Sequence, residues 1–283
     1  MPIPAKLVYI MSLRNAAADR AGQFIPYGSG QRYMMSPLEF LVGALNNTPL
    51  GESYSLEAVI IDDDPDSPAD CRKVEGYGFV PHAQGGWIYP ANLVVQGRPV
   101  DRLLCSVPST YRRLALNDPA RVAGKRDFEQ RLRARLDDAE ADLVVLDGLL
   151  VILSDLVQPH SAYFRRIVNI HPGITRLDSP YERRGAYATL DALHGARGER
   201  VVNWQTMEKV QQAPVLKTGA SFHYVDHGID SGEVILDVLG TDIAPEDTIL
   251  ELRWNNFHNS LFPALQQGLQ RMAELRTLEA AVS

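Results

Sequence analysis

Short apolar runs alternate along the chain with segments in which hydrophobic residues recur every three or four positions. The apolar runs are rich in Val, Ile and Leu and have the length of buried strands. They occupy residues 7–13, 56–61, 103–107, 143–146 and 167–170. Strands that alternate with helical segments predict a parallel sheet joined by crossover helices. We therefore expect an α/β fold, with a doubly wound, mostly parallel sheet flanked by helices.

Two helices are indicated by specific signals. Ser36, Pro37 and Glu39 supply the N-cap, the first-turn proline and the acidic residue of a capping box, so a helix is expected to begin there. This helix is expected to run through Leu45. Within residues 126–139, apolar side chains recur at a spacing of four, which predicts a helix with one buried face and solvated arginines.

The pattern changes after residue 220. Two strands are predicted at 221–225 and 233–239, around the Gly- and Asp-rich loop 226–232. From residue 245 to 283 the pattern is helical, and Pro263 is expected to kink or break this segment.

The length of 283 residues fits one large domain. We expect a single domain over residues 1–283, with its core at about 103–239 joined by the first strand and the capped helix, and with C-terminal helices over 245–283. The stretches 15–33 and 71–102 fit no regular pattern, and loops of that length in a compact domain are typically functional.

Composition narrows the class of function. The 28 Lys and Arg against 35 Asp and Glu give a formal net charge of −7, which disfavours a nucleic-acid partner. Cys71 and Cys105 form no disulfide or zinc motif, and no apolar run approaches the ~20 residues of a membrane span. We therefore expect a cytoplasmic protein without a metal or a membrane partner, whose oligomeric state the sequence leaves open.

Asn169 and His171 end a predicted strand and lie on the same side of it. Open α/β sheets bind ligands at the carboxyl ends of their strands. An amide donor and an imidazole at that position can stabilise an oxyanion and move a proton. The alternative is that both side chains only fix the turn before Pro172.

Asp230 lies in the loop 226–232 with Asp226 and His227. A carboxylate beside an imidazole holds its tautomer and favours its charged form, whereas the alternative is an aspartate that only forms the turn. His223 and His227 stand four residues apart, about 13 Å along a strand at ~3.3 Å per residue. A shared metal ion is therefore excluded unless that segment is helical.

Two further polar segments have weaker signals. Residues 27–31, Tyr-Gly-Ser-Gly-Gln, precede the capped helix as an anion-binding loop would, but they match neither a Walker A nor a G-x-G-x-x-G motif. A plain turn is the preferred alternative. The aspartates within residues 62–66 follow the second predicted strand and are expected to form a solvated turn, with a metal site as the alternative.

The motifs Asn169–Gly173 and Thr218–Gly232, in this order, resemble those of the N10-formyltetrahydrofolate-dependent formyltransferases. Residues 142–153 resemble the strand and folate-binding loop of the same family. Gly173 departs from the family pattern, which usually has Ser at this position. The resemblance implies the formyltransferase fold.

The resemblance also implies roles for individual residues. Asn169, His171 and Asp230 would be the catalytic residues. The folate co-substrate would be held, largely through backbone groups, by Leu149, Leu150, Val151, Ile152, Leu153, Asp226, His227 and Gly228.

Within this family, residues 11–22 and 24–30, the chain length and a central insertion resemble the hydroxyornithine transformylases of pyoverdine-type siderophore biosynthesis. This implies formyl transfer to the side-chain hydroxylamine of N5-hydroxyornithine, a small amino-acid acceptor. The long segment 14–33 replaces the family's phosphate loop. The acceptor-binding residues expected in this segment are Arg14, Arg20, Gln23, Gly28, Ser29 and Arg32.

A hydroxylamine is neutral near pH 7, so its attack on a formyl carbon needs no strong base. Asn169 and a protonated His171 would stabilise the oxyanion, while Asp230 would raise the pKa of His171 and relay a proton. The alternatives are a formyltransferase for an amino-sugar nucleotide or glycinamide ribonucleotide, a formyltetrahydrofolate hydrolase that uses the same residues on water, and a non-catalytic ligand-binding protein.

Overall fold

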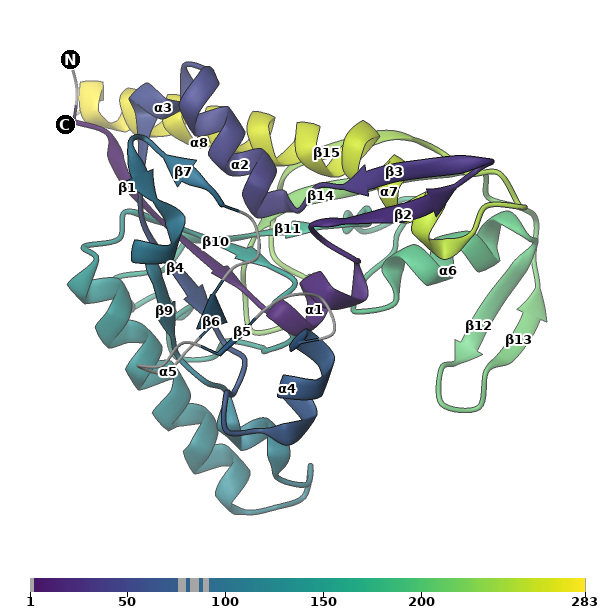
Figure 1. The fold of residues 1–283 in the computed structure, drawn as a ribbon, viewed down its shortest axis with the longest axis horizontal. Coiled ribbons are helices and arrows are strands. Elements are labelled where there is room, and N and C mark those ends of the chain that lie inside the picture. Colours follow the sequence, from purple (N-terminus) through teal and green to yellow (C-terminus); the bar gives the residue numbers. More distant parts are fainter. Residues whose placement is uncertain (1–2, 76–79, 82–86, 89–91, 283) are drawn as a thin grey trace.

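The computed structural model describes residues 3–75, 80–81, 87–88 and 92–282. At its centre is a seven-stranded sheet in the order β15-β14-β11-β10-β1-β4-β9 (Figure 1). Five strands run parallel, namely β1 (Ala5–Met11), β4 (Tyr54–Ile61), β9 (Leu104–Ser106), β10 (Leu143–Asp147) and β11 (Ile167–His171). β14 (Lys217–Tyr224) runs antiparallel to β11, and β15 (Val234–Asp242) pairs antiparallel with β14 at the edge of the sheet. The predicted mostly parallel sheet is confirmed.

Helices cover both faces of this sheet. One face is covered by α2 (Pro37–Asn47), α3 (Leu50–Ser53), the π-helical turn η3 (Phe257–Leu261) and α8 (Phe262–Val282). The other face is covered by α5 (Ala120–Asp138), through the buried side chains Phe128, Leu132 and Leu136. The apolar face predicted for this helix is confirmed, although the helix begins six residues earlier than expected.

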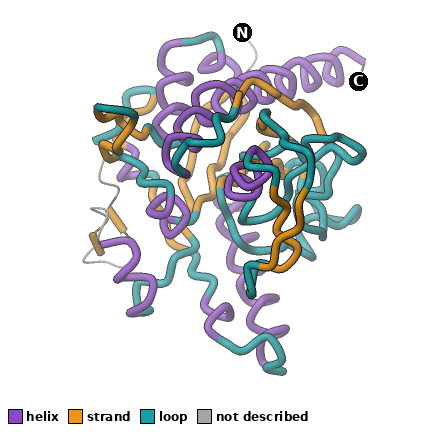
Figure 2. The backbone as a smooth tube through the Cα atoms, turned by 90° about the vertical axis from the view of Figure 1, so that its right-hand side faces the viewer, coloured by secondary structure: helices purple, strands orange, loops and turns teal. Residues whose placement is uncertain are grey.

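The C-terminal helix packs on elements from the beginning of the chain. The ring of Phe262 stacks on Phe40 of α2 with centroids 4.5 Å apart, and the Tyr54 hydroxyl of β4 donates to the Leu269 carbonyl at 2.9 Å. Figures 1 and 2 show α8 running across the top of the molecule, so that it ends on the same side as the start of β1.

The connections contain the remaining elements. The helices are α1 (Leu13–Ala18), α4 (Pro68–Glu75), α6 (Ala188–Ala196) and α7 (Ile249–Asn256), with 3-10 turns η1 (Val100–Arg102) and η2 (Thr110–Arg113). Strand pairs form from β2 (Gln23–Tyr27) and β3 (Gly30–Met34), β5 (Val80–Pro81) and β6 (Trp87–Ile88), β7 (Val94–Val95) and β8 (Arg98–Pro99), and β12 (Glu199–Asn203) and β13 (Glu208–Gln211). None of the helices in the described ranges has the length and hydropathy needed to cross a bilayer.

Two capping boxes start helices. The Ser36 hydroxyl accepts the Glu39 N–H at 3.1 Å and the Glu39 carboxylate accepts the Ser36 N–H at 2.8 Å, as predicted for α2. Thr248 and Glu251 form the same arrangement at the start of α7, a signal that the sequence analysis missed. The break expected near Pro263 corresponds to the π-helical turn that precedes α8.

The order of the strands creates a switch point. β1 lies between β4 and β10, because the chain first adds β4 and β9 on one side of β1 and later β10 and β11 on the other. In open α/β sheets, the carboxyl ends of strands at such a point leave a crevice in which ligands bind. The loops that follow β1, β10 and β11 therefore meet at one edge of the sheet.

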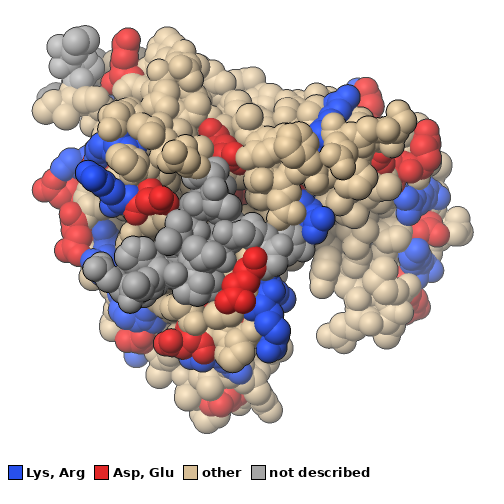
Figure 3. Space-filling model, viewed as in Figure 1, with Lys and Arg blue, Asp and Glu red and all other residues tan. Residues whose placement is uncertain are grey.

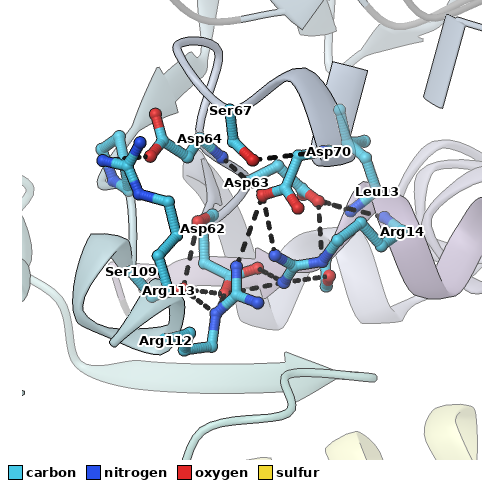
Figure 4. Close-up of polar contacts among 12 residues, drawn as sticks. Leu13, Arg14, Asp62, Asp63, Asp64, Ser67, Asp70, Ser109, Arg112 and Arg113 are labelled. Carbon is cyan, nitrogen blue, oxygen red and sulfur yellow. Dashed lines mark hydrogen bonds and ion pairs between the residues drawn. The ribbon is translucent and has the colours of Figure 1, made fainter. Parts of the chain in front are cut away.

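Arg14, the second residue of α1, is buried at this edge (Figure 4). Its guanidinium lies 3.1 Å from Asp62, 3.2 Å from Asp63 and 2.9 Å from Asp70. The Asp63 carboxylate also accepts the backbone N–H groups of Leu13 at 2.5 Å and Arg14 at 3.1 Å, so it caps the first turn of α1. Arg14 therefore joins the loop after β4 to the helix after β1.

The aspartates at 62–64 are buried, so the predicted solvated turn is wrong. They are 1%, 0% and 3% exposed, and Arg112 and Arg113 add ion pairs to Asp62 and Asp64. With Asp70, four carboxylates therefore surround three guanidinium groups (Figure 4). Burial and the neighbouring Asp62 raise the pKa of Asp63 to about 7. The sequence pattern did not indicate this cluster because its cations come from distant parts of the chain.

We expect Arg14→Gln to lower the free energy of unfolding by about 3–5 kcal/mol, because it leaves buried carboxylates without their central cation. Denaturant unfolding measures this change. The control is Arg72→Gln, which alters an exposed arginine of α4 and should stay within ~0.5 kcal/mol of the wild type. An Arg14→Gln protein that unfolds at the wild-type denaturant concentration would contradict the structural role.

Candidate active site

A cavity of about 330 Å³ lies at the switch point, along the carboxyl ends of β1, β10 and β11. Residues 149–153 after β10 form one wall, and Val225, Asp226 and residues 228–230 after β14 form a second. Asn15 and Asp19 of the α1 region, with Phe257 and Leu261 of η3, line the remaining side. Asn169, His171 and Asp230 all line this cavity.

The structure brings the three predicted catalytic residues into contact. Asp230 Oδ1 accepts a hydrogen bond from Asn169 Nδ2 at 3.1 Å, and Asp230 Oδ2 lies 3.3 Å from His171 Nδ1. The Gly185 N–H donates to Asp230 Oδ2 at 2.8 Å. Asp230 therefore holds both the amide and the imidazole in position.

His223 of β14 completes this cluster, and the sequence analysis assigned it no catalytic place. Its Nε2 lies 3.3 Å from Asn169 Nδ2 and 3.6 Å from Asp230 Oδ1, while its Nδ1 donates to the Tyr224 carbonyl at 2.8 Å. The register places His223 directly opposite Asn169 on the antiparallel neighbour β11. A sequence cannot show which strands pair, so this contact was not predictable. Across the described ranges, no group of three or more His, Cys, Asp and Glu residues could hold a metal ion.

Burial and neighbouring charges set the ionisation of the cluster. Burial opposes the charge of Asp230, but the His223 and His171 rings and the Gly185 N–H hold the pKa of Asp230 below its ordinary range. Burial lowers the pKa of His171, although the Asp230 carboxylate and the Arg183 carbonyl act to raise it. The net downward direction favours the neutral ring, whereas the sequence analysis predicted a protonated one.

The loop that follows Pro172 closes over His171. The Arg183 carbonyl oxygen lies 3.0 Å from His171 Nε2, and Asp230 Oδ2 lies 3.3 Å from Nδ1. The neutral ring can donate to only one of these acceptors, whereas the imidazolium can donate to both. Gly173 allows this approach, because a Cβ at that position would lie 2.5 Å from the Arg183 carbonyl oxygen. The serine that is usual at this position in the family would force the loop away from His171.

Residues 149–153, predicted to hold the folate, line the cavity. Within the described part of the chain, their backbone groups form no hydrogen bonds with other backbone groups, which leaves them available to a ligand. The loop is anchored at its end by the buried Glu129, whose carboxylate accepts the N–H groups of Ser154 at 2.9 Å and Asp155 at 2.7 Å. A glutamate on the buried face of α5 was not singled out by the sequence analysis.

Of the three residues predicted from the second folate loop, Asp226 and Gly228 line the cavity and His227 does not. Asp226 Oδ1 accepts the Gly228 N–H at 2.9 Å and the Ser231 hydroxyl at 2.7 Å. The loop thus holds its own shape.

None of the six predicted acceptor-binding residues is among the described residues that line the cavity. Gly28 and Ser29 form the turn between β2 and β3, and the Arg32 guanidinium lies 3.8 Å from the ring centre of Tyr27 and 4.2 Å from that of Trp254. The other three are Arg14, held in the aspartate cluster, Arg20, which follows α1, and Gln23, which begins β2. The segment 14–33 reaches the cavity through Asn15 and Asp19 instead.

Asp147 is a further cavity residue that the sequence analysis did not single out. It ends β10, and its carboxylate accepts the Tyr9 hydroxyl at 2.8 Å. The sequence feature that could have indicated Asp147 is its position at the carboxyl end of a predicted buried strand, where ligands bind in this class of fold.

The chain is similar to known formyl transferases. A phosphoribosylglycinamide formyltransferase of Bacillus subtilis strain 168 is 24% identical over 185 residues, which are 65% of this chain and 82% of that protein. The solved structure of glycinamide ribonucleotide transformylase 1 from Symbiobacterium toebii matches with a TM-score of 0.56 at 18% identity, over 98% of this chain and 91% of that chain. This second likeness shows a shared fold.

A third similarity is much stronger. PvdF of pyoverdin biosynthesis, described as a structurally unique N10-formyltetrahydrofolate-dependent formyltransferase, matches with a TM-score of 0.88 at 62% identity, over 96% of this chain and 99% of that chain. The sequence profile of the formyl transferase family matches residues 111–265, more than half of the chain. Because this match includes Asn169, His171 and Asp230 where they meet in the cavity, the chain belongs to the formyl transferase family.

Proposed function

We propose that this protein transfers a formyl group from N10-formyltetrahydrofolate to the side-chain hydroxylamine of N5-hydroxyornithine in the biosynthesis of a pyoverdin-type siderophore. The 62% identity to PvdF over 96% of the chain carries this proposal. The contact between Asn169, His171 and Asp230 in one cavity supports it.

The cavity suits the folate co-substrate. The exposed apolar side chains of Leu150 and Ile152 can pack on a flat heterocycle. The backbone groups of residues 149–153, which form no hydrogen bonds with other backbone groups in the described part of the chain, can bind its polar edge. This wall lies beside the catalytic residues, so the formyl group would be presented to Asn169 and His171.

In the proposed reaction the hydroxylamine nitrogen attacks the formyl carbon. A C–N bond forms, and the carbonyl oxygen becomes an oxyanion. The Asn169 amide, oriented by Asp230, is a donor for this oxyanion. The C–N10 bond then breaks, and the proton lost by the attacking nitrogen goes to N10.

His171 is suited to carry this proton. As a neutral imidazole it can accept the proton from the attacking nitrogen, and the adjacent Asp230 carboxylate stabilises the imidazolium that results. The imidazolium then donates to the departing N10. Burial favours the neutral form of the ring before the reaction, and the reaction itself supplies its charge.

His171→Ala should lower kcat by ~10²-fold or more, because it removes a group that acts on charge in the transition state. The Kd for the folate co-substrate should change little. Steady-state kinetics and a folate titration check both values, with His160→Ala, an exposed histidine, as the control. A variant that retains more than about a tenth of the wild-type kcat would exclude His171 from the chemistry.

Asp230→Asn should lower the pKa of His171 further, because burial then acts without the opposing carboxylate. The acidic limb of the kcat profile, where His171 becomes protonated, should move to lower pH, and kcat should fall. An NMR titration of His171 in both proteins measures the pKa directly. An unchanged pKa would mean that the two side chains do not interact.

N5-hydroxyornithine should be formylated far better than ornithine at pH 7. The amine of ornithine has a pKa near ~10.4 by analogy with Lys, so protonation withholds ~10³-fold of its nucleophile. Raising the pH to 9 should narrow the difference. Equal kcat/KM values at pH 7, or a preference for a phosphorylated or nucleotide-linked amine, would refute the acceptor, and acceptor-independent formate release would favour a hydrolase.

A further inference from the structure

Two carboxylates line the cavity but have no role in the formyl transfer described above. Asp19 Oδ1 is paired with Arg253 Nε at 2.9 Å, and Asn15 Nδ2 lies 3.3 Å from Asp19 Oδ2. Asp147 Oδ2 accepts from the neutral Tyr9 hydroxyl at 2.8 Å. Among the residues that the structure describes, no Lys, Arg or His forms an ion pair with Asp147. Asp226, the other cavity carboxylate without an ion pair in the described residues, is occupied by the Gly228 N–H and the Ser231 hydroxyl. Asp147 is therefore left without a compensating cation and outside the loop contacts.

Asp147 lies on a different face of the sheet from the catalytic residues. In the strand register, Asp147 is opposite Ile170, whereas Leu146 is opposite Asn169. Side chains alternate between the two faces along a strand, so Asp147 shares a face with Ile170, and Asn169 and His171 point to the other. Since all of these residues line one cavity, the cavity bends around the carboxyl edge of the sheet.

The two sides of the cavity differ in chemistry. The side of Asn169 has the apolar wall 149–153 that suits the folate, whereas the side of Asp147 has Asp19 and Asn15 as polar neighbours. We propose that Asp147, with Asp19 and Asn15 beside it, binds the α-ammonium group of the amino-acid acceptor. This inference rests on the proposed function. It assigns the recognition of the acceptor's α-ammonium group to Asp147.

Distance and charge both support this assignment. Adjacent strands lie about 4.8 Å apart, and the three-methylene stem of hydroxyornithine spans roughly 6 Å with bonds near 1.5 Å. An acceptor held at Asp147 on β10 can therefore place its hydroxylamine beside Asn169 on β11. Burial and the nearby Asp19 raise the pKa of Asp147 to about 7. An ammonium group bound beside Asp147 would lower this pKa again, because it favours the charged carboxylate. A phosphorylated acceptor would meet two carboxylates at this position.

The experiment compares N5-hydroxyornithine with 5-(hydroxyamino)pentanoate, which has the same nucleophile and lacks the α-amino group. The wild-type enzyme should prefer hydroxyornithine roughly 10- to 100-fold in kcat/KM, as expected for a hydrogen bond between two charged groups. Asp147→Asn keeps the shape of the side chain and removes its charge, so this preference should fall to about twofold or less. The loss should appear mainly in the KM for hydroxyornithine.

The matched control is Asp142→Asn, at the opposite end of β10, where the carboxylate accepts the Lys6 N–H at 2.9 Å. It should retain the wild-type preference. If the wild-type enzyme used both acceptors equally, or if Asp147→Asn kept the full preference, the ammonium subsite at Asp147 would be refuted. The proposed function would still stand. A wild-type enzyme that formylates another class of amine and not hydroxyornithine would overturn the proposed function as well.

Discussion

The active site depends on one buried carboxylate. Asp230 receives hydrogen bonds from Asn169 of β11 and from the Gly185 backbone, and it lies beside the rings of His171 and His223. Its backbone is in the left-handed region at φ 46°, which turns the side chain back toward the sheet. Gly232 allows this tight turn, because a Cβ there would lie 1.8 Å from the Tyr224 carbonyl oxygen. Two strands and two loops thus meet at a single negative charge.

The sequence was informative where chemistry is local. Apolar runs indicated the strands of the sheet, the Ser36 capping box indicated the start of α2, and the two motifs around Asn169 and Asp230 indicated groups that do come together. It was uninformative where a partner lies far along the chain. The burial of Asp62 requires Arg14 and Arg112, and the place of His223 requires the pairing of β14 with β11. Neither the ion pairs nor the strand pairing can be predicted from the pattern of a single sequence.

Two groups of buried acids at the carboxyl edge of the sheet differ in their charge balance. The four aspartates of the Arg14 cluster share three guanidinium groups, each aspartate having at least one ion pair, and this cluster joins the ends of β1 and β4. Asp147 has no such partner among the described residues, and it lines the cavity. On the face shown in Figure 3, acidic and basic side chains are mixed, so the surface charge of that face does not distinguish these two groups of acids.

The position of α8 affects how the chain folds as it is synthesised. The core on the α5 face uses residues from Val8 to Ile167, so it can close when little more than half of the chain has emerged from the ribosome. The core on the opposite face also needs Phe262 to Met272. Until those residues are made, this sheet face is covered only in part, by α2 and α3, and exposed apolar surface of that kind is prone to aggregation. The side of β1 that carries Leu7, Tyr9 and Met11 is therefore completed only after the last helix has been made.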